Sequence, residues 1–353
     1  MKSNLANSFL RTQHRCGSPA SSWIGTGTFS QAPAVFLAVI ALLLPAAVLA
    51  QAAAVPRIAI VYMGTPETDR EARESFAKGM SDRGYTNAKN VVFDEAFLKG
   101  RNETVRQTID GLLRRKPAVI VVAGSHAAQA AKAATSTVPI VVATMGDPVA
   151  QGLVASLARP GGNLTGNFIF AEALGTKRLE LLKELLPKAA EIGYLWNPTN
   201  PVAAWNVKNM DAAAKRLGVR LTHLRASSEA MLDEVLASLP GRRLDALLLS
   251  ADGTSVVFRK KIVASLAASR IPAMYPSSTV AAEGGLISYA SSGAEFWRNA
   301  ASFVDRILRG AKPGDLPIEQ ATKFELVVNL KTARALGITI PQSILLRADR
   351  VIE

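Results

Sequence analysis

Short apolar runs alternate with amphipathic segments along the first part of the chain that follows residue 56. The apolar runs have the length and composition of buried strands, and they lie at 57–63, 91–97, 118–123 and 139–143. The segments between them have the spacing of amphipathic helices, at 71–83, 103–116 and 126–134. This alternation is typical of a parallel sheet that is covered by helices.

A stretch rich in glycine and proline, from 146 to 166, interrupts this order, and the same alternation then begins again. The second series of strands is expected at 191–196, 220–224, 244–249, 273–275 and 286–289. Its helices are expected at 175–186, 201–217, 229–239 and 255–269. Two series suit a chain of this length, because a single core stops growing near about 250–300 residues. The sequence therefore predicts an α/β fold with two parallel-sheet, Rossmann-like lobes.

The segment after the second series predicts one more helix, at 295–309, and one more strand, at 324–329. We expect so late a strand to return to the first lobe, and several crossings between the lobes would form a hinge. The predicted domains are residues 57–170 with 293–335 for lobe 1, residues 171–292 for lobe 2, and residues 336–353 for a C-terminal segment.

Residues 1–50 differ from the rest of the chain, because they contain basic residues but no Asp or Glu, followed by an uncharged apolar run. An apolar core at 35–44 and small residues up to Ala50 are typical of a secretory signal peptide. The alternative is a membrane anchor, but a spanning helix needs about 20 apolar residues, and Pro45 interrupts this shorter run. The sequence predicts export, with cleavage near Ala50.

The chain has a formal net charge of +13, which raises the question of nucleic acid as a partner. Its basic residues form short scattered clusters, with no long basic run and no interleaved aromatic residues. Solvated helix surface explains them better, so no nucleic-acid partner is expected. The one cysteine, Cys16, lies in the predicted leader, so the mature chain has no disulfide, thiolate nucleophile or cysteine metal site.

Ligands of open parallel sheets bind in the crevice beyond the carboxyl ends of the strands. The candidate ligand-binding residues at these ends are Gly64, Thr65, Gly124, Ser125, His126, Met145, Asp147, Asn197, Asp252 and Tyr275.

Two chemical roles are expected among these candidates. Ser125, at a helix start with free N–H groups, is placed to receive a carboxylate, although a serine there also suits a simple helix cap. Asp147 and Asp252, one from each sheet, are placed to receive an ammonium group. Each aspartate is equally a turn former, because Pro148 follows one and Gly253 follows the other.

Catalysis is poorly supported by the sequence. The chain has no G-x-S-x-G elbow, H-E-x-x-H pair, Walker loop or G-x-G-x-x-G after a strand. Two histidines and no cysteine follow the leader, so pairs of a nucleophile and a base are scarce. The prediction is a protein that is not an enzyme and that uses no cofactor and no metal.

Four segments resemble one known family: GDPVAQGLVASLARPGGNLTG at 146–166, KRLELLKELLPKA at 177–189, NPTNP at 197–201 and ATKFELVVNLKTA at 321–333. They are similar to stretches of ABC-transporter substrate-binding proteins related to tryptophan-uptake lipoproteins, and the likeness runs from about residue 57 to the C-terminus. The resemblance implies the type I periplasmic-binding-protein fold, with two lobes around a cleft. It also implies a small-molecule ligand, such as an aromatic or other amino acid.

The resemblance further implies a periplasmic protein that delivers its ligand to an ABC permease and ATPase at the membrane. A different class of function on the same fold is a ligand-sensing receptor domain that works with a membrane partner. An α/β enzyme is the third alternative, and the missing catalytic motifs count against it.

Overall fold

The computed structural model describes residues 55–320 and 323–353, without the side chains of residues 171 and 172. The predicted signal peptide and its cleavage point lie outside the described residues. Within the described part of the chain, no helix combines the length and the hydropathy of a membrane span.

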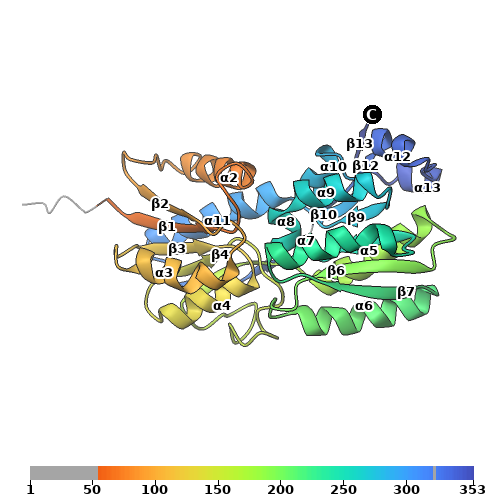
Figure 1. Ribbon diagram of the computed structural model, residues 1–353. Helices are drawn as coiled ribbons and strands as arrows, with labels where there is room; N and C mark the ends of the chain where they lie inside the picture. The colour runs from red at the N-terminus through yellow and green to blue at the C-terminus, as the bar shows by residue number, and fades with distance from the viewer. Residues whose placement is uncertain (1–54, 321–322) are drawn as a thin grey trace, which may run out of the picture. The chain divides into compact units, whose positions relative to one another are not determined.

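Six parallel strands form the first sheet, in the order β11-β5-β4-β3-β1-β2 (Figure 1). Their bounds are β1 (Arg57–Tyr62), β2 (Val92–Phe97), β3 (Val119–Val122), β4 (Ile140–Val142), β5 (Leu164–Phe168) and β11 (Glu319–Gln320). The apolar runs predicted to be buried strands are buried, since every residue of β3 and β4 is buried. β5 lies in the stretch that interrupts the pattern, where no strand was predicted.

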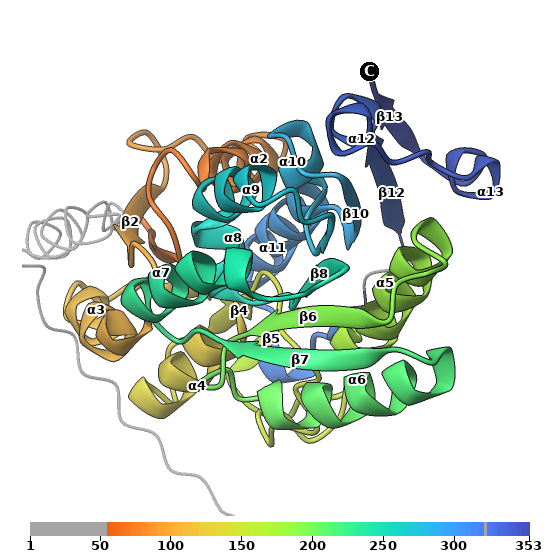
Figure 2. The ribbon, with the colours of Figure 1, turned by 45° about the vertical axis from the view of Figure 1, so that its right-hand side comes forward.

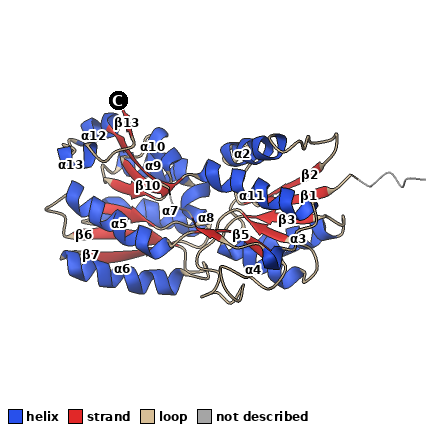
Figure 3. Ribbon diagram, turned by 180° about the vertical axis from the view of Figure 1, so that it is seen from behind, coloured by secondary structure: helices blue, strands red, loops and turns tan. Residues whose placement is uncertain are grey.

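Helices cover both faces of the first sheet. They are α2 (Arg70–Ser81), α3 (Val105–Leu113) after the 3-10 turn η1 (Asn102–Thr104), α4 (Ser125–Ala134) and α11 (Gly293–Leu308). Helices α3 and α4 pack on one face, and α2 and α11 pack side by side on the other (Figure 3). Gly79 permits this close approach, because a Cβ there would lie 2.8 Å from the Cβ of Ala301.

The second sheet has seven strands, in the order β13-β12-β10-β9-β8-β6-β7. Their bounds are β6 (Glu191–Trp196), β7 (Arg220–Arg225), β8 (Ala246–Leu249), β9 (Ala273–Tyr275), β10 (Ile287–Ser291), β12 (Phe324–Asn329) and β13 (Arg350–Ile352). Each described pair is parallel except β10 with β12, which is antiparallel. Two mostly parallel sheets with helices on their faces confirm the predicted fold class.

The helices of the second sheet also form two layers (Figure 2). On one face lie α5 (Ala171–Leu185), α6 (Ala203–Leu217), α12 (Leu330–Leu336) and α13 (Gln342–Leu345). On the other lie α7 (Glu229–Ser238), α9 (Arg259–Ala268) and α10 (Ser278–Ala282). Three short elements complete the description: α8 (Gly253–Val257), η2 (Leu239–Gly241) and η3 (Pro313–Asp315).

The late strand does not return to the first lobe as expected. β12 pairs with β10 in the second sheet, with Ile287 opposite Val328, and its Leu326 and Val328 are buried in that sheet's core. The two-residue strand β11, paired with β5, ends the first sheet instead. The assignment of 293–335 to lobe 1 is therefore wrong for β12 and α12, because short-range patterns do not specify which sheet edge a strand joins.

Candidate functional site

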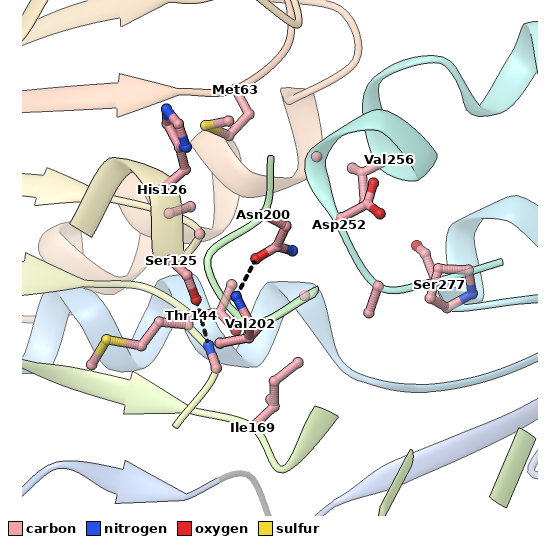
Figure 4. Close-up of a pocket in the computed structure, with 18 of the residues that line it drawn as sticks. Met63, Ser125, His126, Thr144, Ile169, Asn200, Val202, Asp252, Val256 and Ser277 are labelled. Carbon is pink, nitrogen blue, oxygen red and sulfur yellow. Dashed lines mark hydrogen bonds between the residues drawn. The ribbon is translucent and has the colours of Figure 1, made fainter. Parts of the chain in front are cut away.

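A cavity of about 280 Å³ lies where the carboxyl ends of strands from both sheets meet. Figure 4 shows Met63 and His126 on the side of the first sheet, and Asp252, Val256 and Ser277 on the side of the second. Six of the predicted site residues line it: Gly124, Ser125, His126, Met145, Asn197 and Asp252. The rule that ligands bind beyond the strand ends thus located the cavity.

The start of α4 forms part of the wall on the side of the first sheet. Gly124 is the N-cap residue with a φ of 88°, a left-handed conformation that glycine adopts without strain. Ser125 does not cap its own helix, because its Oγ accepts a hydrogen bond of 3.0 Å from the backbone N–H of Gly146 (Figure 4). The first N–H groups of a helix have no partner within it, so this end offers hydrogen-bond donors to the cavity.

Asp252 lies on the opposite wall and is almost completely buried. Its carboxylate accepts hydrogen bonds from the backbone N–H groups of Ser255 and Asn197, both at 3.1 Å, and from the hydroxyl of Ser250. Burial raises the pKa of Asp252, and these donors oppose that shift. The side chain therefore joins the ends of β6 and β8 and caps α8.

Four of the predicted residues do not line the cavity: Gly64, Thr65, Asp147 and Tyr275. Asp147 forms a turn, since its Oδ1 accepts hydrogen bonds from the backbone N–H groups of Val149 and Ala150. Tyr275 is buried in the core of the second sheet. In the turn that follows β1, the backbone N–H of Gly64 donates to the carboxylate of Asp69. The backbone N–H of Thr65 donates to the hydroxyl oxygen of Thr68.

Several polar residues of the wall were not among the predicted site residues, and they include Asp69, Asn102, Arg178 and Ser291. Burial raises the pKa of Asp69, whose Oδ2 accepts the Gly64 N–H at 2.7 Å. Asn102 Oδ1 and Ser291 Oγ are buried without a hydrogen-bond partner. Asp69 precedes α2, and the other two lie at the ends of η1 and β10, where the periodic pattern of a sequence gives no signal.

Arg178 on α5 is the most buried charged side chain of the cavity, with 2% of its surface exposed. Its Nε donates a hydrogen bond of 2.7 Å to the carbonyl oxygen of Tyr289 in β10. Burial lowers the pKa of Arg178 to about 10, so the guanidinium is still charged at neutral pH. A signal was present in the sequence, because Leu174, Arg178 and Leu181 have the spacing of one helix face.

The two lobes contact each other beside the cavity. Arg259 at the start of α9 donates to the carbonyl oxygen of Thr68 at 3.3 Å, and it also forms an ion pair with Glu283 at 2.8 Å. Thr279 in α10 donates to Glu71 in α2 at 3.0 Å. Within the described residues, the chain also crosses between the sheets after β5, β10 and β11.

The model of the family described as "ABC transporter substrate binding protein" matches residues 57–352 of this chain. A curated relative, the tyrosine-binding protein of Clostridioides difficile strain R20291, is 28% identical over 272 residues, which are 77% of each chain.

Solved structures of similar fold include an ABC domain from Streptococcus pneumonia in complex with L-Trp. It has 25% sequence identity and a TM-score of 0.77, and the match covers 84% of this chain and 99% of that one. A conserved domain protein from Vibrio cholerae has 26% identity and a TM-score of 0.78 over the same shares. A ligand-free, open substrate-binding protein with adhesive properties from Clostridium difficile has 24% identity and a TM-score of 0.59, also over 84% and 99%.

Proposed function

Because the chain belongs to the family of ABC transporter substrate-binding proteins, we propose that it captures an amino acid between its lobes for import. Members of this family are extracytoplasmic and bind a small molecule for an ABC transporter. The observation that supports capture most directly is the cavity between the carboxyl ends of two sheets. Its volume lies near the lower end of the range of about 300–1,000 Å³ for small-molecule sites.

An aromatic amino acid is the ligand we propose, for two reasons. One relative is a tyrosine-binding protein, and one solved structure holds L-Trp. The cavity wall also has a large apolar part, which suits an aromatic side chain. Its apolar residues include Met63, Met145, Ile169, Leu174, Val202, Val256, Phe296 and Trp297.

We propose ligand contacts for the six predicted residues that line the cavity, and no chemical step on the ligand. Asp252 is the one of the two predicted ammonium partners that reaches the wall, whereas Asp147 lies in a turn outside it. Asp69, with one carboxylate oxygen bonded to Gly64, is a second candidate for a cationic group.

The lobes of the proposed binding protein are residues 57–168 with 293–320, and residues 171–291 with 324–352. They would close on the ligand by bending at the crossings between the sheets. The contact of Arg259 with Thr68 fits a closed arrangement. The higher TM-score with the L-Trp complex than with the ligand-free, open structure fits it as well.

We propose that the protein is exported to the periplasm, with cleavage near Ala50. There it would pass its ligand to an ABC permease and ATPase. N-terminal sequencing of the exported protein is expected to begin near Gln51. A mature form that retains the apolar run at 35–44 would instead show a membrane anchor.

The function is tested by identifying the solute. Mass spectrometry of protein purified under native conditions is expected to find an amino acid, and titration calorimetry is expected to show that L-tyrosine or L-tryptophan binds. Small-angle scattering should then give a more compact particle with ligand than without. Binding of a sugar but no amino acid would reject the ligand class, and no compaction at saturating ligand would reject lobe closure.

A further inference from the structure

Arg178 is a buried cation without an anionic partner in the described part of the chain. Burial is the main influence on its pKa, and no carboxylate of the described residues is among the groups that shift it. One neutral acceptor, the carbonyl oxygen of Tyr289, bonds its Nε. A guanidinium has five N–H donors in a planar fork, so the donors of its two terminal nitrogens are left for other groups.

In the ligand-free protein this arrangement lowers the stability of the fold. A buried charge is stabilised only when it is paired or fully hydrogen-bonded. A second cavity of about 20 Å³ also borders Arg178, with Tyr194, Asn206 and Ser250 among its walls. It is large enough for about one water molecule, which can bond one N–H but supplies no negative charge.

Ser291 gives an independent sign of a ligand at this place. Its hydroxyl oxygen is buried, has no hydrogen-bond partner, and lines the same cavity as Arg178. It follows two residues after Tyr289 along β10, whose carbonyl bonds Arg178. A buried hydroxyl without a partner is uncommon in folded proteins and calls for a missing group.

We propose that Arg178 receives the carboxylate of the ligand, with Ser291 as a second donor, so that the solutes of this protein are carboxylic acids. The inference rests on the proposed function, and it moves the carboxylate from the start of α4 to α5. Arginine suits this role, because its fork pairs with both oxygens of a carboxylate at once. The closed lobes would exclude water from the pair.

The test compares ligands that differ only at the carboxylate. Titration calorimetry with L-tyrosine, L-tyrosinamide and tyramine, and with L-tryptophan and its amide, is expected to show at least about tenfold weaker binding when the carboxylate is absent. Arg178→Met is expected to lower the affinity for the acids by about tenfold or more. Because the guanidinium that receives the carboxylate is missing, Arg178→Met should bind the acid and the amide with almost equal affinity.

Lys177→Met is the matched control. It removes a positive charge from the neighbouring position of the same helix, where Lys177 is half exposed and pairs with Glu180. It is expected to keep both the affinity and the preference for the acid. Equal losses in both variants would show that general charge, and not the buried guanidinium, attracts the ligand.

A purely structural role of Arg178 predicts the opposite result for the empty protein. If Arg178 serves to hold β10 through Tyr289, then Arg178→Met should melt below the wild type. If it serves the ligand, then removing an unpaired buried charge should leave the melting temperature of the ligand-free protein unchanged or higher. A lower melting temperature together with an unchanged acid preference would overturn the inference.

The failure of each proposal has its own signature. Tight binding of neutral solutes such as sugars, with the same affinity in Arg178→Met, rejects the carboxylate while leaving solute capture intact. No binding of any acid, amide or neutral solute rejects both, since the guanidinium would then have no partner to receive.

Discussion

Two buried charges lie on the same lobe of this protein, and their surroundings differ completely. Asp252, between β8 and α8, is bonded by the backbone of Ser255 and Asn197 and by the hydroxyl of Ser250. Arg178, on α5, has one neutral acceptor and no carboxylate among the described residues. Both line the cavity.

The difference separates a charge whose hydrogen bonds are already supplied by the fold from one that has no charged partner among the described residues. The partners of Asp252 come from its own lobe, so its interactions are complete before any solute arrives. Arg178 lines the cavity, and no carboxylate of the described residues pairs with it, so we propose that its electrostatic partner is the ligand. A buried charge is therefore informative about function only after its hydrogen bonds have been counted.

The largest effect is expected from Asp252→Ala. It leaves two buried N–H groups and one hydroxyl without their acceptor, at about 1–3 kcal/mol for each unsatisfied group. The free energy of unfolding of the ligand-free protein, from urea titration, should fall by about 3 kcal/mol or more. Normal stability of the ligand-free variant would show that these hydrogen bonds do not stabilise the fold, whatever happens to the ligand affinity.

Asp147→Ala is the matched control for this variant. Asp147 also accepts two backbone N–H groups, but those of Val149 and Ala150 belong to exposed residues that water can reach. The loss of stability should be about 1 kcal/mol.

The third buried charge near the cavity, Arg259, tests lobe closure. Its ion pair with Glu283 lies within the second lobe, but its bond to the carbonyl oxygen of Thr68 crosses to the first. We expect Arg259→Met to weaken ligand binding about fivefold or more without a contact to the ligand, because the closed state loses a bond. Small-angle scattering at saturating ligand should show a larger fraction of open particles.

Lys261→Met controls for the loss of a paired charge on the same helix. Lys261 pairs with Glu229 and Asp233, which both lie in the second lobe. Its affinity for the ligand should be unchanged. If Arg259→Met closes as readily as the wild type, then the contact with Thr68 does not hold the lobes together.

The smallest effect is expected from Asp94→Asn, at the edge of the first sheet. Hydrogen bonds from Arg57, and then from Arg115, lower the pKa of Asp94 despite its burial. Both arginines are well exposed, so the pairs are worth only about 1 kcal/mol.

The effect of Asp94→Asn should depend on pH. The stabilisation is present above the ordinary Asp pKa of about 3.9, and it is lost as the pH falls through the lowered pKa of the folded state. Urea titrations at pH 7 and pH 3 should therefore show a smaller gap in the free energy of unfolding between variant and wild type at pH 3 than at pH 7. Asp110→Asn, which breaks an exposed pair with Arg106, should show almost no gap at either pH.

The sequence by itself determined the alternation of strands and helices. Runs such as 118–123 and 139–143 are too apolar for any place but a buried strand, and the helices between them leave one buried and one solvated face. The parallel order of the strands then placed their carboxyl ends, with Gly124, Ser125 and Asp252, at the cavity. The period of hydrophobic residues along short segments is enough to predict these strands, these helices and the edge at which the strands end.

Only the tertiary structure decided the sheet of β12 and the roles of the charged side chains. An apolar strand fits the edge of either sheet, and its neighbour is fixed by packing that spans the chain. Asp252 and Asn197 are 55 residues apart, and Arg178 meets Tyr289 across 111 residues. A turn-forming aspartate and a charged helix residue look alike in sequence whether or not they are buried, because burial and pairing depend on contacts between distant segments.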